Sequence, residues 1–190
     1  MFPHADDPEL EKSIAIIGSG PAGLISAHVL LNDGFKNVEV LTRDHSPGGT
    51  WAAERLPPDV KINKFVASSA LSYSNTEVNL LSVHGEYRFS CLPMPTPEGS
   101  KKSGGRLTGE DIRLYMESFT DRFLKDRIQY DTVITNIHRE DVENDETKGR
   151  GRWAVSVRNR NTGVEEVKRY HRIVLCTGVS SVSSALVDTI

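Results

Sequence analysis

The chain has 190 residues, of which 37% are hydrophobic, and its 23 basic and 26 acidic side chains give a formal net charge of -3. This length suffices for one domain with a sizeable core, and the mixed charge predicts neither a nucleic-acid-binding face nor a polybasic membrane anchor. Because no apolar run reaches the roughly 18 residues of a membrane span and residues 1–13 lack a secretory signal pattern, we expect a soluble, cytoplasmic protein.

The first predicted elements are a strand, a glycine turn, a helix and a second strand. After a stretch at 1–12 that we expect to be flexible, the apolar residues 14–17 predict a short buried strand. Residues 24–31 predict a helix that starts near Pro21, and residues 37–42 predict the second strand. Two strands joined by a helix within about 30 residues predict a parallel pair with a right-handed crossover.

A long segment rich in proline, glycine and serine follows at 46–105, with one possible strand at 86–90. Regular structure resumes at 107–126, where the apolar residues recur at helical spacing. Thr108 and Asp111 have the spacing of a capping box at the start of this helix. The apolar face of the predicted helix carries Ile112, Tyr115, Met116, Phe119 and Phe123.

Three strand-like runs complete the chain, at 129–137, 152–159 and 165–178. The charged stretch 138–151 between the first two is expected to form a solvated hairpin turn. These elements predict an α/β fold, in which a Rossmann-like βαβ domain carries an added β-meander and spans residues 13–178.

The turn after the first strand has the sequence GSGPAG, residues 18–23. Gly18 permits the tight turn, Gly20 lets the backbone approach a pyrophosphate, and Gly23 lets the helix pack closely on the strand. The helix start then offers free N–H groups and its positive dipole end to the phosphates. The flanking strand and helix make this a dinucleotide-binding fingerprint, whereas a second formal match at 149–154 precedes a strand pattern and predicts a hairpin turn.

The residue that should bind the ribose hydroxyls departs from the usual pattern. An acidic residue is expected at the end of the second strand, about 20 positions after the third glycine. Thr42 stands there, and Asp44 comes two residues later. Thr42 offers one hydroxyl, and Asp44 either bends back toward the ribose or is a solvated turn residue.

Three motifs together resemble the flavin-containing monooxygenases and the related Baeyer–Villiger enzymes: GSGPAGL at 18–24, GGTW at 48–51 and LCTG at 175–178. The departures are Thr42 for the usual glutamate and Cys176 for the usual alanine. The resemblance implies that the 190 residues contain an FAD-binding lobe. The residues it implies for FAD contact are Gly18, Ser19, Gly20, Pro21, Ala22, Gly23, Thr42, Arg43, Gly49, Thr50, Trp51 and Gly178.

The same resemblance implies an oxidoreductase that uses FAD and NADPH to insert one oxygen atom into a small nucleophilic or ketone substrate. Asn63 is similar to the family's asparagine near the isoalloxazine ring and is the candidate catalytic residue, with a positioning role. A pyridine-nucleotide disulfide reductase is the alternative enzyme class, but it needs a neighbouring cysteine pair. Cys91 and Cys176 are far apart and lack metal-ligand spacing, so we expect reduced thiols and no metal site.

Two segments fall outside the family's pattern. The serine-rich stretch 65–82 has no charge except Glu77, and we expect it to be an inserted loop that adds nothing to the flavin site; the alternative is a family-specific loop over the flavin edge. Residues 179–190 are too few for a second dinucleotide fingerprint. We therefore expect a fold that is incomplete at the C-terminus, or a truncated, non-catalytic dinucleotide-binding protein.

Overall fold

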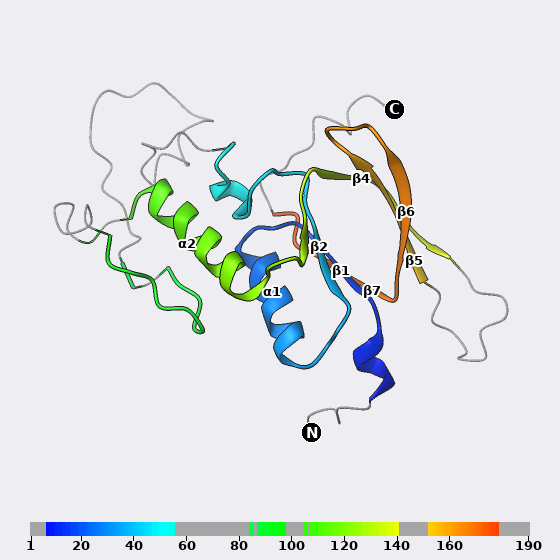
Figure 1. The fold of residues 1–190 in the computed structure, drawn as a ribbon, viewed down its shortest axis with the longest axis horizontal. Coiled ribbons are helices and arrows are strands. Elements are labelled where there is room, and N and C mark those ends of the chain that lie inside the picture. The colour runs from blue at the N-terminus through cyan, green and yellow to red at the C-terminus, as the bar shows by residue number, and fades with distance from the viewer. Residues whose placement is uncertain are drawn as a thin grey trace.

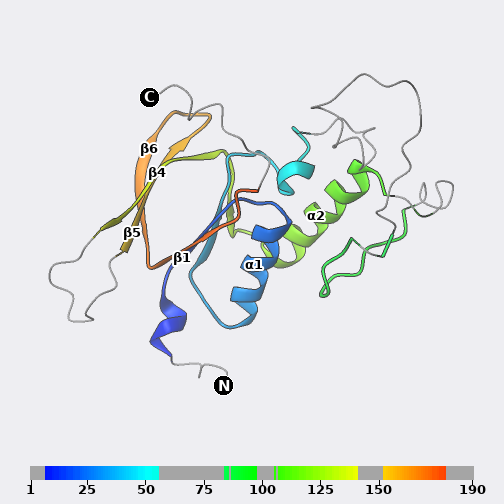
Figure 2. The same cartoon turned by 180° about the vertical axis from the view of Figure 1, so that it is seen from behind.

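The computed structural model describes residues 7–55, 84–85, 87–97, 105, 107–140 and 152–178. Figure 1 shows a central sheet with two helices on one side and a second, strongly twisted sheet on the other, and Figure 2 shows the same layers from behind. In chain order the elements are η1 (Pro8–Glu11), β1 (Ile14–Ile17), α1 (Pro21–Asn32), β2 (Val38–Leu41), η2 (Gly49–Trp51), α2 (Gly109–Phe123), β3 (Ile128–Gln129), β4 (Thr132–Glu140), β5 (Arg152–Asn159), β6 (Glu165–Tyr170) and β7 (Arg172–Leu175).

The predicted βαβ unit is confirmed. All residues of β1 are buried, as expected for a strand covered on both faces. The strands β1 and β2 are parallel, with Ile14 beside Val38 and Ile17 beside Leu41, and α1 connects them. The helix is followed by Gly34, whose φ of 98° is a left-handed conformation that glycine adopts at no steric cost.

The central sheet has the strand order β3-β2-β1-β7, and all its pairings are parallel. β1 therefore lies between β2 and the last described strand of the chain. Beyond the end of β1, the Ile17 carbonyl accepts a hydrogen bond from the Cys176 N–H (2.8 Å), and the Gly18 N–H donates to the Leu41 carbonyl (2.9 Å). The turn that follows β1 is thus fixed by both neighbouring strands.

The helix predicted at 107–126 is confirmed as α2. Its apolar face packs against α1 and the central sheet; Ile112, Tyr115, Met116 and Phe119 are buried, and Phe123 is partly buried. The strand predicted at 86–90 is wrong for the described residues 87–90, which have no strand structure. Their rings cover α2 instead, since Phe89 stacks on Tyr115 and contacts Phe119.

The capping box at the start of α2 is also confirmed. The Asp111 N–H donates to Thr108 Oγ1 (3.1 Å), and the Thr108 N–H donates to the Asp111 carboxylate (2.8 Å). We expect Thr108→Ala to lower the free energy of unfolding by about 1 kcal/mol, because the Asp111 N–H loses its acceptor. Urea unfolding of the 190-residue chain measures this, and Thr108→Ser, which keeps the hydroxyl, is the control. Equal losses in both variants would contradict a role for the cap.

The β-meander is confirmed as an antiparallel sheet of order β4-β5-β6, with different strand bounds. The run predicted at 129–137 divides into β3 and β4 because Asp131 turns the chain with a φ of 54°. The run at 165–178 divides at His171, where the chain crosses from β6 in the meander to β7 in the central sheet. β4 continues to Glu140, so the turn predicted at 138–151 begins later than expected.

The meander packs on the face of the central sheet opposite the helices. Ala15, Ile17 and Leu41 from the central sheet form one buried cluster with Val155, Val157 and Tyr170. The rest of the core lies on the helix side. Both faces of the central strand β1 are therefore covered, which explains why its sequence, IAII, is continuously apolar.

Three predictions concern residues at the margins of this description. In the N-terminal stretch 1–12, residues 8–11 form η1 and Leu10 is buried, so this part packs on the domain. The proposed insertion at 65–82 and the tail at 179–190 lie outside the described residues.

No helix in the described part of the chain has the length and apolar character needed to cross a bilayer.

Candidate dinucleotide-binding site

A cavity of about 620 Å³ lies at the carboxyl ends of β1, β2 and β7, the edge of a parallel sheet where ligands bind in open α/β folds. Its walls come from the glycine turn, the end of β2, the GGTW segment, the start of β4 and the residues after β7. Of the residues implied by the family resemblance, those that line it are Gly18, Ser19, Gly20, Pro21, Ala22, Thr42, Arg43, Gly49, Thr50 and Gly178.

The remaining candidate residues have other positions. Gly23 lies in the first turn of α1, behind the cavity wall. Trp51 is not among the lining residues; its ring packs against the helix-side core, and its Nε1–H donates to the Tyr87 hydroxyl (3.1 Å). Asn63 lies outside the described residues.

The three glycines of the fingerprint differ in why they must be glycine. Gly18 has a φ of 109°, and a Cβ there would lie 2.4 Å from the Cys176 carbonyl oxygen. A Cβ on Gly23 would lie 1.9 Å from the Gly18 carbonyl oxygen. Protein packing alone therefore requires glycine at both positions.

Gly20 has no such packing reason. Apart from its chain neighbours, the nearest described atom to a Cβ built there is the Gly49 Cα, at 3.9 Å. The backbone of Gly20 is extended, with φ of -71° and ψ of 175°, which other residues adopt without strain. Its missing side chain leaves room at the cavity wall, which fits a ligand that approaches the backbone closely.

The start of α1 supplies an electrostatic reason for an anionic ligand. The N-cap is Gly20, which provides no side-chain cap, and the first turn contains no acidic residue. Pro21 has no N–H to leave unsatisfied, and both Pro21 and Ala22 line the cavity. The positive end of the helix dipole and its free N–H groups are therefore available to phosphate oxygens.

The glycine turn, the end of β2 and the GGTW segment are hydrogen-bonded to one another. Ser19 Oγ donates to Thr42 Oγ1 (3.0 Å), and both residues are buried. The Ser19 carbonyl accepts from the Gly48 N–H (2.8 Å). Gly49, with a φ of 60°, approaches Gly20 so closely that a Cβ on Gly49 would lie 2.8 Å from the Gly20 Cα. These contacts fix the positions of the three parts of the cavity wall relative to one another.

Asp44 is a buried member of the cavity wall, so its interpretation as a solvated turn residue is wrong. The residue is 6% exposed. Its Oδ1 accepts hydrogen bonds from Arg55 Nη2 (2.7 Å) and Arg55 Nε (3.1 Å), and both residues line the cavity. Sequence reasoning missed Arg55, which stands shortly after GGTW without a motif of its own.

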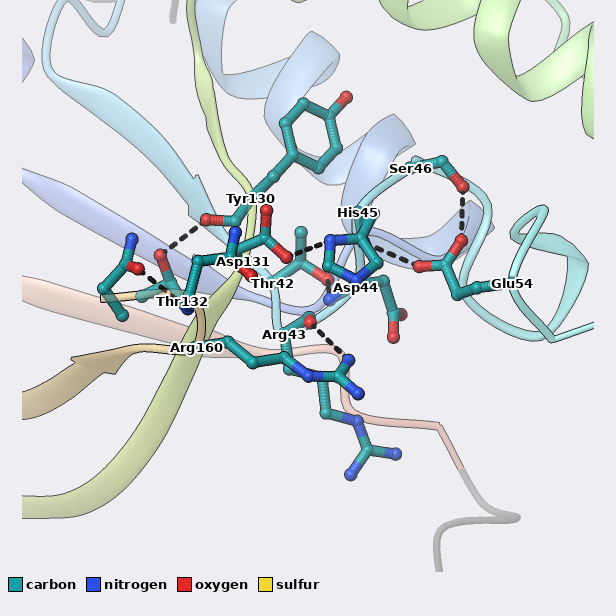
Figure 3. A network of polar contacts seen from close by, with 12 residues as sticks. Thr42, Arg43, Asp44, His45, Ser46, Glu54, Tyr130, Asp131, Thr132 and Arg160 are labelled. Atoms are coloured by element: carbon teal, nitrogen blue, oxygen red, sulfur yellow. Dashed lines mark hydrogen bonds and ion pairs between the residues drawn. The ribbon is translucent and has the colours of Figure 1, made fainter. Parts of the chain in front are cut away.

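A polar network outside the cavity fixes this part of the wall (Figure 3). Glu54 accepts hydrogen bonds from the His45 N–H (2.6 Å) and Ser46 Oγ (2.8 Å), and the His45 ring contacts the Asp131 carboxylate. Burial alone would raise the pKa of Glu54, but these hydrogen bonds and one from its own N–H together outweigh burial and lower the pKa. Glu54 therefore holds the loop as a carboxylate at neutral pH.

The Cys176 thiol, which lies at the cavity, does not have the features of a reactive cysteine. Cys91 and Cys176 are both free, and burial raises the pKa of the Cys176 thiol, only partly offset by a hydrogen bond with Ser26. The thiol is therefore protonated and unreactive at neutral pH. Within the described ranges, no group of histidine, cysteine and acidic residues could hold a metal ion.

Comparison with known proteins identifies relatives over most of the chain. Residues 16–79 match the family of NAD(P)-binding Rossmann-like domains. Flavin-containing monooxygenase FMO GS-OX-like 2 of Arabidopsis thaliana is 27% identical over 180 residues, which are 90% of this chain and 37% of that protein. The chain thus spans little more than a third of the length of this relative.

Solved structures agree with this relationship. S-allyl-L-cysteine S-oxygenase from Allium sativum superposes with a TM-score of 0.62 over 88% of this chain and 36% of its own; at 21% identity this likeness concerns the fold alone. Cyclohexanone monooxygenase from Rhodococcus sp. Phi1, bound to NADP+, has a TM-score of 0.54 and 27% identity over 88% of this chain and 26% of its own. The resemblance inferred from the three motifs is confirmed: the chain is a relative of the N-terminal part of flavin-containing and Baeyer–Villiger monooxygenases.

Proposed function

We propose that this chain binds FAD and represents the FAD-binding portion of an NADPH-using flavin-dependent monooxygenase. The observation that carries the proposal is the space at Gly20. The protein's own packing does not require glycine there, yet the position lies at the helix start and opens on the cavity. A pyrophosphate that contacts the backbone explains this glycine, as it does in dinucleotide-binding folds. Similarity to a flavin-containing monooxygenase favours a flavin dinucleotide, FAD, as the ligand.

The residues of the cavity wall have distinct roles in this proposal. The N–H groups at the start of α1 bind the pyrophosphate, while Gly18 and Gly23 hold the turn in the shape that exposes them. Gly49 and Thr50 line the path beyond the pyrophosphate. The flavin supplies the redox and oxygen-transfer chemistry, and the protein binds it, orients it and excludes water. Asn63 remains the proposed positioning residue beside the flavin ring.

FAD binding by the 190-residue chain is the direct test. Purified protein should retain or take up FAD, measured as quenching of flavin fluorescence in a titration and as yellow colour after gel filtration. The variant Leu114→Val, which alters an exposed side chain of α2 outside the cavity, should bind FAD like the parent chain. Folded protein with no affinity for FAD would contradict the proposed function.

We propose that substrate oxygenation needs a second dinucleotide site, for NADPH, beside the FAD site. Of the two formal G-x-G-x-x-G/A matches, only the one at 18–23 lies between a strand and a helix, and among the described residues no other segment has the form of a site that would position NADPH against the flavin. We expect the 190-residue polypeptide to bind FAD but to show no NADPH oxidation stimulated by an amine, a sulfide or a ketone. Stimulated NADPH oxidation by this polypeptide would contradict that expectation. We propose the same three compound classes as substrates of a longer form.

A cytoplasmic location is the remaining part of the proposal. The two free cysteines support it, because thiols stay reduced in a reducing compartment. Cell fractionation followed by detection of the chain tests the location directly, and recovery in a secretory or membrane fraction would contradict it.

A further inference from the structure

The residue at the usual ribose-binding position is poorly placed for that task. Thr42 is only 4% exposed. Its Oγ1 already accepts hydrogen bonds from Ser19 Oγ (3.0 Å) and, more weakly, from the Asp44 N–H (3.3 Å). A hydroxyl in this position stabilises the cavity wall, and it lacks the two oxygens with which a carboxylate can accept from both hydroxyls of a ribose.

Asp44 offers what Thr42 lacks. The carboxylate lines the cavity, and both hydrogen bonds from Arg55 go to the same oxygen, Oδ1. No hydrogen bond or ion pair from any described residue reaches the second oxygen, Oδ2. The carboxylate therefore has one oxygen anchored by Arg55 and one to which no described residue is hydrogen-bonded, and this second oxygen can accept from a ligand hydroxyl.

The backbone that carries Asp44 is fixed by the corner between β3 and β4 (Figure 3). The Asp131 N–H donates to the Asp44 carbonyl (3.1 Å), and the Thr132 N–H donates to the Thr42 carbonyl (2.8 Å). The Thr42 N–H in turn donates to the Gln129 carbonyl (3.0 Å). Residues 42 and 44 therefore continue the sheet's hydrogen bonding past the end of β2, and the direction of the Asp44 side chain is set before any ligand binds.

Arg55 is held in the same frame. Its N–H donates to the Ala52 carbonyl (2.9 Å), and the preceding residue, Glu54, is bonded to His45 and Ser46, which follow Asp44 directly. The guanidinium compensates the burial of the Asp44 charge. Arg55 is thus a positioning residue that acts through Asp44.

We infer that Asp44, oriented by Arg55, binds the adenosine ribose of the dinucleotide, in place of the residue at the end of β2. This inference rests on the proposed function, since it concerns the same cavity. The inference predicts selectivity for a dinucleotide whose ribose hydroxyls are free, because the Asp44 carboxylate would repel a phosphate on the ribose. Binding of such a phosphate by the nearby Arg43 and Arg160 is the competing outcome.

The test combines removal of a ligand hydroxyl with removal of the carboxylate. Binding of ADP, 2'-deoxy-ADP and 3'-deoxy-ADP to the full 190-residue chain is measured by calorimetry. The parent should bind ADP about 10-fold to 100-fold more tightly than at least one deoxy analogue, as expected for a hydroxyl bonded to a charged group. In Asp44→Asn this discrimination should fall to a few-fold or less, because the charged acceptor is gone.

Three further variants separate effects on ribose binding from effects on folding. Asp44→Asn leaves the Arg55 guanidinium without its anion, so the double variant D44N/R55M, which carries no unpaired charge, is measured beside it. Arg55→Met alone should weaken discrimination between ADP and the deoxy analogues. The double variant should discriminate between these ligands as much as Asp44→Asn does, because Arg55 acts through Asp44. Thr42→Val, the matched control, should change the affinity for ADP and for both analogues equally.

Three results would overturn the inference. Full discrimination in folded Asp44→Asn, or in D44N/R55M, would show that another group binds the ribose. Tighter binding of adenosine 2',5'-bisphosphate than of ADP, lost in Arg43→Met, would show a phosphate-selective site instead. Absence of any ADP or FAD binding by the parent chain would overturn the proposed function together with this inference, whereas the first two results leave FAD binding intact.

Discussion

Replacement of Gly23 by alanine is expected to lower the free energy of unfolding by about 3 kcal/mol or more. The added Cβ would lie 1.9 Å from the Gly18 carbonyl oxygen, so α1 and the glycine turn must move apart. Neither can move easily, because the Gly18 N–H is bonded to the end of β2 and the preceding residue, Ile17, is bonded to Cys176 after β7. Urea unfolding measures the loss.

The matched control for this prediction is Gly20→Ala, the same chemical change three positions earlier. Its Cβ would meet only the Gly49 Cα, at 3.9 Å, so the loss should stay below about 1 kcal/mol, the usual range for changes at an N-cap. If both variants unfold at the same urea concentration as the parent, the packing role assigned to Gly23 is wrong.

Gly20→Val is expected to lower the affinity for FAD strongly while it lowers stability only slightly. Valine suits the extended backbone of this residue, so the unfolding midpoint should stay close to that of Gly20→Ala. Its branched side chain, however, would fill the space at the start of α1 that the pyrophosphate needs. We expect FAD affinity to fall by about 100-fold or more, since both the close backbone contact and the N–H bonds to a charged phosphate are lost.

A flavin titration of Gly20→Val, Gly20→Ala and the parent chain gives the answer. Affinity should fall in the order parent, alanine variant, valine variant, while the urea midpoints remain similar. Equal retention of flavin by the folded valine variant would remove the glycine turn from the cofactor site, and the proposed function would lose the observation that carries it.

The parts of the fold that were predictable from sequence are those governed by neighbouring residues. The strand, glycine turn and helix at 14–32 carry their own apolar pattern and turn chemistry, and the structure places them as expected. The cap of α2 depends on two residues three positions apart, Thr108 and Asp111, and was equally clear.

The errors concern features that depend on distant partners. Residues 86–90 alternate like a strand, but the described rings Tyr87 and Phe89 pack on Trp51 and α2, so the alternation reflects a core contact. The strand-like run at 165–178 continues through His171 although the chain changes sheets there, because β6 and β7 are both strands. No local pattern distinguishes one strand from two in such a run.

The same rule holds for the residues of the site. The phosphate-facing glycines follow a known local pattern, whereas the sequence left the role of Asp44 open between a ribose contact and a solvated turn residue, because its partner, Arg55, has no motif of its own. The pair exists because Glu54 joins the two loops, and because β3 and β4 hold the backbone of residues 42 and 44. Neither relationship has a sequence signature.

The position of β1 between β2 and β7 has a consequence for synthesis of the protein on the ribosome. Ser13 and His171 are hydrogen-bonded partners 158 positions apart, and the Gly18 turn is closed by the backbone at Cys176. The nascent chain can form the βαβ unit early, but the central sheet lacks β7 until nearly all of the described residues have been made. Dinucleotide binding should therefore appear only after β7 has been synthesised, and any product that stops before Arg172 leaves β1 without its partner strand on one side.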